Sequence, residues 1–330
     1  MDNKHTVFPE LLDPITREPL KYGEQHGQQF LKSETGSRYE VMLGIPRIVE
    51  SLSNYTDAFG LQWKKWTKTQ LDSFTGTTIT KARIERCLGK ELHEMLSSSK
   101  ETLNVLEFGC GAGRFTEILL QYNVRLVSAD LSSAVEANAE NCPVSINHQI
   151  VQADILNSPF GPSYDVVICL GVIQHTPNSE AAIDALYSMV KPGGRLVIDH
   201  YTYDLKRFTK LALAFRPLIK RLPARYRIRL CEQLVSFFLP IHKMIRNIPF
   251  AQAIFSRISP ITSYYHAYPE LSDESQRAWA VLDTHDGLTD WNKSIRSLSS
   301  IKKTLSKLKA KNIEVWRGGN GVEARCVKPE

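Results

Sequence analysis

The segment 105–120, VLEFGCGAGRFTEILL, constrains the fold more than any other part of the sequence. An apolar run of strand character meets glycines at every second position, and a helical pattern follows. A strand, a glycine-rich turn and a helix in this order place backbone N–H groups and a helix N-terminus beside a ligand. The segment therefore predicts a phosphate or nucleoside site in a protein that alternates strands and helices.

The alternation continues along the chain and sets the fold class. Further strands are expected in VRLVSAD, NHQIVQAD, YDVVICLG and GRLVIDHY. Continuous Val, Ile and Leu runs bounded by helices favour a parallel sheet covered on both faces, and NIEVWRGGNGVEARCV predicts a closing hairpin. We therefore predict an α/β fold with a doubly wound, mostly parallel, seven-stranded sheet.

Shifts in composition divide the sequence into five expected segments. They are 1–50 (small β-rich module), 51–101 (helical cap or linker), 102–204 (core), 205–300 (basic helical lid with the substrate pocket) and 301–330 (last helix and β-hairpin of the core). Glycines and prolines punctuate short apolar pieces in the first segment, as turns between short strands do.

The spacing of residues within the glycine-rich segment limits the classes of ligand that it can bind. In the dinucleotide pattern G-x-G-x-x-G/A a third small residue lets the helix pack on the strand, but that position here is Arg114. Asp130 closes the second expected strand, 21 residues after Gly109, where a carboxylate accepts hydrogen bonds from ribose hydroxyls. Asp154 closes the third strand and can accept from an adenine amino group, or it can cap a helix.

These residues resemble the class I S-adenosylmethionine (SAM)-dependent methyltransferases, which have a Rossmann-like fold. The matching pieces are VLEFGCGAGRF, SADLS, QADI and YDVVICLGVIQHTPNSEAAIDALYSMVKPGGRLVI, within 102–204, with a weaker match near 300–330. The resemblance implies SAM as the cofactor. It implies cofactor contacts from Glu107, Gly109, Gly111, Gly113, Asp130, Leu131, Asp154, Ile155, Leu170 and Gly171.

Histidines and acids supply the candidate catalytic groups. His175 follows the fourth expected strand, where a neutral imidazole could take a proton from a substrate hydroxyl or simply hold the loop. His285 and Asp286 lie in LDTHDGLTD, which is expected to be a polar loop. They could form a base with its orienting partner, a metal site or a solvated turn. No metal is predicted. Candidate substrate-pocket residues are Trp63, Tyr201, Tyr264, Tyr265 and His266.

The N-terminal module resembles the zinc-ribbon-like segment found before bacterial methyltransferase domains, through LLDP and YEVMLGIPRIV. Zinc-binding versions carry two CxxC pairs, and the four corresponding positions here are Asp13, Thr16, Lys32 and Thr35. The resemblance therefore implies a module without zinc ligands that packs or recruits.

Positive charge is concentrated in one part of the expected lid. Residues 205–258 hold twelve Lys or Arg and one acid, Glu232. This asymmetry favours an anionic partner for the segment. Because long apolar side chains are interleaved with the bases, an anionic membrane surface is favoured over nucleic acid.

Other features of the sequence predict the compartment. The six cysteines are scattered without a CxxC pair, which favours a reducing environment. No apolar run reaches the roughly 20 residues of a membrane span, and the start MDNKHTVFPE lacks a signal-peptide pattern. The expected location is cytoplasmic, with peripheral attachment at the inner membrane face as the alternative.

The sequence thus predicts an enzyme that transfers a methyl group to an oxygen of a small-molecule or saccharide acceptor by direct displacement. The alternatives are a peripheral membrane methyltransferase with a lipid-linked acceptor, an RNA methyltransferase, and a non-catalytic SAM-binding partner protein. The sequence leaves the oligomeric state open.

Overall fold

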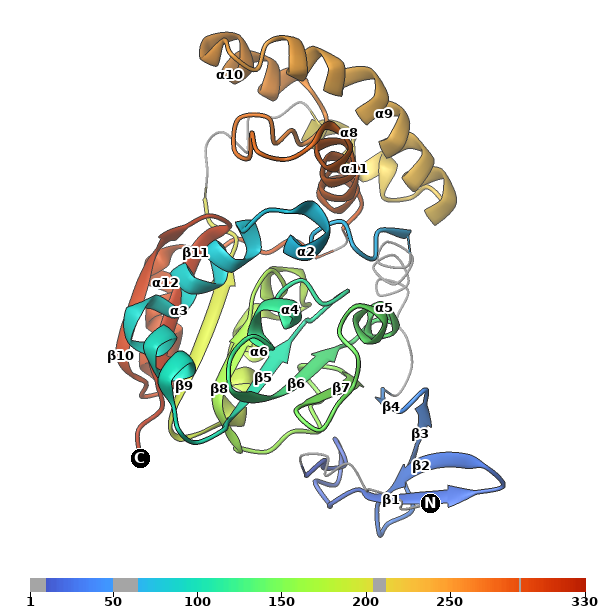
Figure 1. Cartoon of the computed structure of the whole chain (residues 1–330), viewed down its shortest axis with the longest axis vertical. Coiled ribbons are helices and arrows are strands. Elements are labelled where there is room, and N and C mark those ends of the chain that lie inside the picture. Colours follow the sequence, from blue (N-terminus) through green and yellow to red (C-terminus); the bar gives the residue numbers. More distant parts are fainter. Residues whose placement is uncertain (1–9, 50–64, 204–211, 291) are drawn as a thin grey trace. The chain divides into compact units, whose positions relative to one another are not determined.

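The computed structural model describes residues 10–49, 65–203, 212–290 and 292–330. The chain divides into two compact units, which are described separately (Figure 1). The first unit consists of Met1–Thr67, Lys81–Thr202 and Ser294–Glu330, and the second of Lys68–Thr80 and Tyr203–Lys293.

The first unit is built on one sheet with the strand order β1-β2-β3-β4-β7-β6-β5-β8-β9-β11-β10. The strands are β1 (Lys21–Gln25), β2 (Gln28–Lys32), β3 (Arg38–Met42), β4 (Ile45–Ile48), β5 (Leu103–Phe108), β6 (Val124–Asp130), β7 (His148–Ala153), β8 (Tyr164–Cys169), β9 (Val190–His200), β10 (Lys311–Gly318) and β11 (Gly321–Val327). Every strand expected from the sequence core is present, and the closing hairpin is β10–β11.

The sheet is larger than the seven strands predicted. Strands β4-β7-β6-β5-β8-β9 pair in parallel with one another, and β11 runs antiparallel between β9 and β10. Strand β4 extends the β7 edge through the register pairs Arg47↔Gln152 and Ile48↔Ala153, and it carries the antiparallel β1–β3 strands with it. Such pairing between segments about a hundred residues apart leaves no periodic pattern in the sequence.

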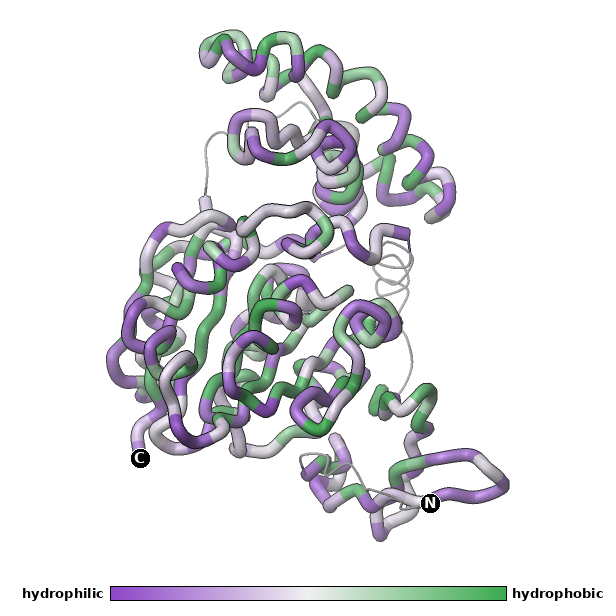
Figure 2. The backbone as a smooth tube through the Cα atoms, in the orientation of Figure 1, coloured by the Kyte–Doolittle hydropathy of each residue, from purple (hydrophilic) through white to green (hydrophobic). Residues whose placement is uncertain are grey.

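Helices cover both faces of the parallel strands. The helices of this unit are α3 (Ile79–Ser98, whose first residues belong to the second unit), α4 (Thr116–Leu119), α5 (Ala134–Asn141), η1 (Ile173–His175), α6 (Ser179–Met189) and α12 (Leu298–Lys307). Along β5, Leu106 and Phe108 join a buried cluster with α6 and α12, whereas Val105 joins one with α3 and α4. Both faces of the sheet are therefore covered by helices, as the continuous apolar strands predicted. Figure 2 shows the central strands as mainly hydrophobic.

Two arginines join the N-terminal strands to the core of the same unit. Arg17 donates to the carbonyl oxygens of Ser158 and Phe160 at 2.6 and 3.0 Å. Arg47 donates to Gln152 Oε1 at 3.1 Å and forms an ion pair with Glu136 at 3.3 Å. The module therefore packs on the core through charged hydrogen bonds as well as through strand pairing.

The second unit is helical, with α2 (Asp72–Thr75), α8 (Ala212–Ile219), α9 (Ala224–Met244), α10 (Pro249–Ile258) and α11 (Asp273–Thr289). Helix α11 packs against α8 and α9. The side chain of Trp279 is buried in α11, and its indole N–H donates to the Thr69 carbonyl at 2.6 Å. In the part of the chain that the structure describes, no helix is both long and apolar enough to cross a bilayer.

The prediction of a polar loop at LDTHDGLTD is wrong, because these residues form the end of α11 and its C-cap. Ser272 caps the N-terminus of α11 by accepting the Ser275 N–H at 3.1 Å. Leu282, His285 and Leu288 recur at helical spacing and are buried. Tertiary packing of this face thus overrides the low helix propensity of the Asp, Thr and Gly residues.

Candidate active site

The turn after β5 holds three glycines in left-handed backbone conformations. The φ angles of Gly109, Gly111 and Gly113 are 82°, 52° and 96°, which residues with a Cβ rarely adopt. The N–H groups of Gly109 and Cys110 both donate to the Ala129 carbonyl, at 2.7 and 3.0 Å. Hydrogen bonds to β6 therefore hold the turn at the carboxyl end of the sheet, where ligands bind in open α/β folds.

Gly109 also allows the loop after β8 to approach. A Cβ at this position would lie 2.1 Å from Val172 Cγ2, which is far inside van der Waals contact. The glycine turn and the segment after β8 therefore pack directly against each other, and no larger residue fits at position 109 without a shift of either segment.

Asp130 organises the turn from the end of β6. One carboxylate oxygen accepts the Gly111 N–H at 2.9 Å, and the other accepts the backbone N–H and hydroxyl of Ser132 at 2.8 and 2.7 Å. Burial of the carboxyl group raises its pKa above the ordinary value of 3.8, and the hydrogen bonds from Ser132 and Gly111 oppose this shift. Since a carboxylate has about four acceptor positions, Asp130 retains capacity for a ligand hydroxyl.

Glu107 lies beneath the turn in a buried polar network. Its Oε2 accepts from the hydroxyls of Thr116 and Ser128 at 2.6 and 3.2 Å, and His148 Nε2 lies 3.1 Å from the Ser128 hydroxyl. Its Oε1 is buried without a hydrogen-bond partner. Burial raises the pKa of Glu107 from 4.5 to about 7. A buried carboxyl group with one unsatisfied oxygen favours a cationic ligand or a proton.

The raised pKa of Glu107 makes stability depend on pH with a defined sign. Between 4.5 and about 7 the native protein keeps a proton that the unfolded chain releases, so the free energy of unfolding falls as pH rises. The full difference corresponds to about 3 kcal/mol. We expect Glu107→Gln to remove this fall, measured by urea unfolding at pH 5 and pH 7.5. An identical pH slope in wild type and variant would contradict the assignment.

Asp199, which the sequence reasoning missed, holds the loop after β8 from inside β9. Its Oδ1 accepts the Gly171 N–H at 2.6 Å, and its Oδ2 accepts from Asn320 Nδ2 at 3.4 Å and from the Arg83 guanidinium of α3. The side chain of Asp199 is fully buried. Burial alone would lower the pKa of Arg83, but the charge of Asp199 raises it. This buried ion pair positions Gly171 at the carboxyl edge of the sheet.

A second buried carboxylate stands beside the first, since Glu323 of β11 pairs in register with Asp199. Glu323 accepts from Arg86 at 2.6 and 3.0 Å, from the Trp316 indole at 3.0 Å and from the Gly319 N–H at 3.1 Å. Both acids interrupt apolar strand sequences, LVIDHY and GVEARCV. An acid inside a buried strand indicates that a cationic side chain lies against it. Here α3 supplies these cations, Arg83 to Asp199 and Arg86 to Glu323.

The remaining predicted cofactor residues line the same edge or pack beneath it. Asp154 Oδ1 accepts the Leu156 N–H at 3.0 Å, and no helix begins there, so the helix-cap alternative is wrong. The Leu131 carbonyl accepts from Gln152 Nε2 at 2.9 Å. Ile155 and Leu170 are buried in the two hydrophobic clusters of the core.

His175 and Tyr201 come together at the same edge. Their rings meet edge to face, with centroids 5.4 Å apart. His175 ends η1 after β8, and Tyr201 follows β9. Beside them, His200 is a histidine that the sequence reasoning did not select. Its Nδ1 lies 2.8 Å from the Tyr201 carbonyl, and its Nε2 lies 3.2 Å from the Ser294 hydroxyl. Burial lowers the pKa of His200 below 6.5, which favours the neutral imidazole.

The other predicted catalytic and pocket residues belong to the second unit, except Trp63, which lies outside the described residues. His285 is buried and Asp286 half-buried on α11. Tyr264 hydrogen-bonds to Asp283 and stacks on Tyr268 at 5.7 Å. The Tyr265 hydroxyl donates to Asp273 at 3.1 Å, while His266 is exposed.

The residues at the edge of the first unit fit a nucleoside that carries a positive charge. The glycine turn leaves backbone room, Asp130 retains acceptor capacity, and the unsatisfied Glu107 oxygen suits a cation. SAM combines an adenosine with positively charged groups, so the acceptor capacity of Asp130 and the unsatisfied oxygen of Glu107 both match it.

Sequence comparison finds proteins named as methyltransferases among the relatives of this chain. The ubiquinone biosynthesis O-methyltransferase of Pseudomonas entomophila is 28% identical over 123 residues, 36% of this chain and 53% of that protein. The enzyme of the same name from Colwellia psychrerythraea is 28% identical over 127 residues, 37% of this chain and 51% of that protein. The chain thus spans about half the length of the curated relatives it matches.

Among solved structures, a putative S-adenosyl-L-methionine-dependent methyltransferase from Methanococcus maripaludis aligns with 86% of this chain and 97% of its own, at 16% identity and a TM-score of 0.44. The family model described as a methyltransferase domain matches residues 80–246, just over half of the chain. The methyltransferase part of the predicted resemblance is therefore confirmed, whereas the likeness of the N-terminal module to a zinc ribbon stays a prediction. The chain belongs to the methyltransferase domain family.

Proposed function

We propose that the chain is a SAM-dependent methyltransferase that acts on an oxygen of a small-molecule or saccharide acceptor. The observation that carries the proposal is the left-handed glycine turn fastened to Asp130 at the carboxyl edge of the sheet. The relatives named O-methyltransferases support oxygen as the accepting atom. When bound, SAM would supply a methyl group on a positively charged sulfur. The acceptor oxygen would attack the methyl carbon directly, and S-adenosylhomocysteine would leave as the neutral thioether.

Different residues of the first unit bind and orient different parts of the cofactor. The glycine turn and Asp130 bind the ribose side, and Asp154 accepts from the adenine. Glu107 offers a buried carboxyl oxygen beneath the turn, and Asp199 holds the Gly171 N–H in place after β8. The contribution of the protein is alignment and exclusion of water, which together reduce the entropic cost of the displacement.

His175 is the candidate proton acceptor of the first unit. General-base catalysis contributes about 10²- to 10⁴-fold to rate. If His175 takes the acceptor proton, His175→Gln lowers kcat by that order while the affinity for S-adenosylhomocysteine stays unchanged. His285→Ala and Asp286→Ala test the two residues of α11 in the same assay. The variant whose kcat falls without loss of cofactor affinity identifies the base.

The N-terminal module is assigned a packing role without zinc. Its first turn is closed by Asp13, whose carboxylate accepts the N–H groups of Ile15 and Thr16 at 2.8 Å each and the Tyr39 hydroxyl at 3.2 Å. We propose that these hydrogen bonds replace the metal that zinc-ribbon versions use to hold this turn.

The cofactor site is tested by Asp130→Ala. Loss of a charged acceptor costs about 1.5–3 kcal/mol, so we expect S-adenosylhomocysteine to bind roughly 10- to 100-fold more weakly in calorimetry. Asp184→Ala on α6 is the matched control, because this acid is exposed and lies in the same unit. Unchanged affinity in the Asp130 variant would refute the site.

Acceptor class is tested by methyl transfer from radiolabelled SAM into cell extract. Label in small aqueous products supports the proposed acceptor. Label in the organic phase identifies a lipid-linked acceptor instead, and label released by ribonuclease identifies RNA. Absence of transfer together with tight S-adenosylhomocysteine binding would leave the non-catalytic partner protein as the function.

A further inference from the structure

The strongest feature outside the candidate active site is the outer surface of α9 and α10 in the second unit. Phe237, Met244 and Phe250 expose 68%, 80% and 77% of their surface. Ile248, Ile254 and Ile258 are each about half exposed. Soluble proteins rarely leave so many large apolar side chains together on a surface without a partner. We call these six residues the α9–α10 apolar surface.

The exposure follows from how the two helices pack within this unit. Helix α10 lies on α9 through Phe255, which meets His242 with ring centroids 4.8 Å apart, and Ser259, whose hydroxyl lies 2.9 Å from His242. Gln252 adds a 3.0 Å contact to the same histidine. Phe250, Ile254 and Ile258 recur every four residues on the remaining face of α10. One face of α10 thus packs against α9, and the opposite face is left apolar and exposed.

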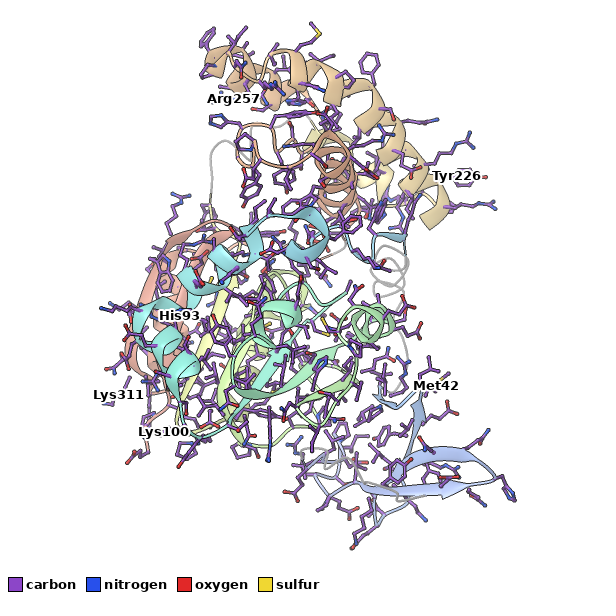
Figure 3. The ribbon with its side chains drawn as sticks, in the orientation of Figure 1. Met42, His93, Lys100, Tyr226, Arg257 and Lys311 are labelled. Atoms are coloured by element: carbon purple, nitrogen blue, oxygen red, sulfur yellow. The ribbon has the colours of Figure 1, made fainter. Side chains whose placement is uncertain are left out.

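Basic residues accompany the apolar ones. Arg246 and Arg257 are exposed between or beside the apolar side chains, whereas Lys243 forms an ion pair with Asp273 of α11 at 2.5 Å. No Asp or Glu occurs between Glu232 and Glu270. Figure 2 shows hydrophobic and hydrophilic residues alternating along α9 and α10, and Figure 3 shows Tyr226 projecting outward from the N-terminal part of α9.

We propose that the α9–α10 surface docks onto an anionic lipid bilayer. Large apolar side chains enter the boundary between headgroups and acyl chains, while Lys and Arg contact the anionic headgroups. RNA phosphates could pair with the Arg residues and RNA bases could stack on Phe, but the exposed Ile and Met side chains serve neither contact. This inference concerns membrane attachment and goes beyond the proposed methyl transfer.

The test is flotation of the full chain with phosphatidylcholine vesicles that contain or lack phosphatidylglycerol. We expect binding only with phosphatidylglycerol, weakening as salt increases. Phe237→Ser with Phe250→Ser should reduce partitioning by about tenfold or more. Arg246→Gln with Arg257→Gln should reduce it roughly 25-fold at low salt, since each basic residue near the surface contributes about fivefold. Ile146→Ser, which alters a residue 84% exposed in the first unit, is the matched control.

Three results would overturn the proposal. The first is failure of the wild-type chain to bind phosphatidylglycerol vesicles. The second is wild-type-like binding by the Phe237/Phe250 variant. The third is a dimer in sedimentation velocity that this variant dissociates while vesicle binding stays absent, because the surface would then pair two copies of the chain. Cofactor affinity and circular dichroism, unchanged in all variants, exclude misfolding as the cause of lost binding.

Discussion

Gly109→Ala is expected to destabilise the first unit by about 3 kcal/mol. Roughly 1 kcal/mol comes from the left-handed backbone, where φ is 82°. The remainder comes from overpacking, because the new methyl group would lie 2.1 Å from Val172 Cγ2. Urea unfolding followed by fluorescence and circular dichroism measures the change in the free energy of unfolding.

Gly171→Ala is the matched control for this variant. Its φ of 80° is nearly that of Gly109, but a Cβ at position 171 meets no atom within 4 Å. We expect it to cost only the backbone part, about 1 kcal/mol. Val172→Ala should recover part of the Gly109→Ala loss, seen as a coupling energy in a double-mutant cycle. Equal losses for the two glycine variants would show that the approach of Val172 contributes nothing.

Asp199→Ala is expected to cost about 3–5 kcal/mol, because it leaves the Arg83 guanidinium buried without its carboxylate partner. The substitution also removes the acceptor for the Gly171 N–H, so we expect weaker S-adenosylhomocysteine binding in the variant that still folds. Asp199→Asn keeps an acceptor for Gly171 but loses the charge. It therefore separates the ion-pair contribution to stability from the positioning of the loop.

Glu91→Ala provides the control on the same helix and strand. Glu91 of α3 pairs with Arg195 of β9 at 2.5 Å, but its side chain is 82% exposed, whereas that of Asp199 is fully buried. An exposed ion pair contributes less than about 1 kcal/mol. If Asp199→Ala costs no more than Glu91→Ala in urea unfolding, the buried network does not stabilise the site.

Local sequence determined the parallel core and the position of the left-handed glycine turn. Each expected core strand is present because a run of Val, Ile and Leu is buried on both faces. The glycines stand where the backbone takes left-handed angles, a requirement that is local and therefore visible in the sequence. The methyltransferase family was predicted from the same glycine-rich stretch together with Asp130 at the end of the next strand.

Tertiary structure alone decided three further features. Strand β4 joins the β7 edge, which enlarged the sheet beyond seven strands. The segment around His285 became helix, since burial of one face of α11 outweighed its polar composition. Arg83 and Asp199, 116 residues apart, met as a buried pair. Each of these depends on contacts between distant segments, so one segment taken alone does not show which partner it will meet.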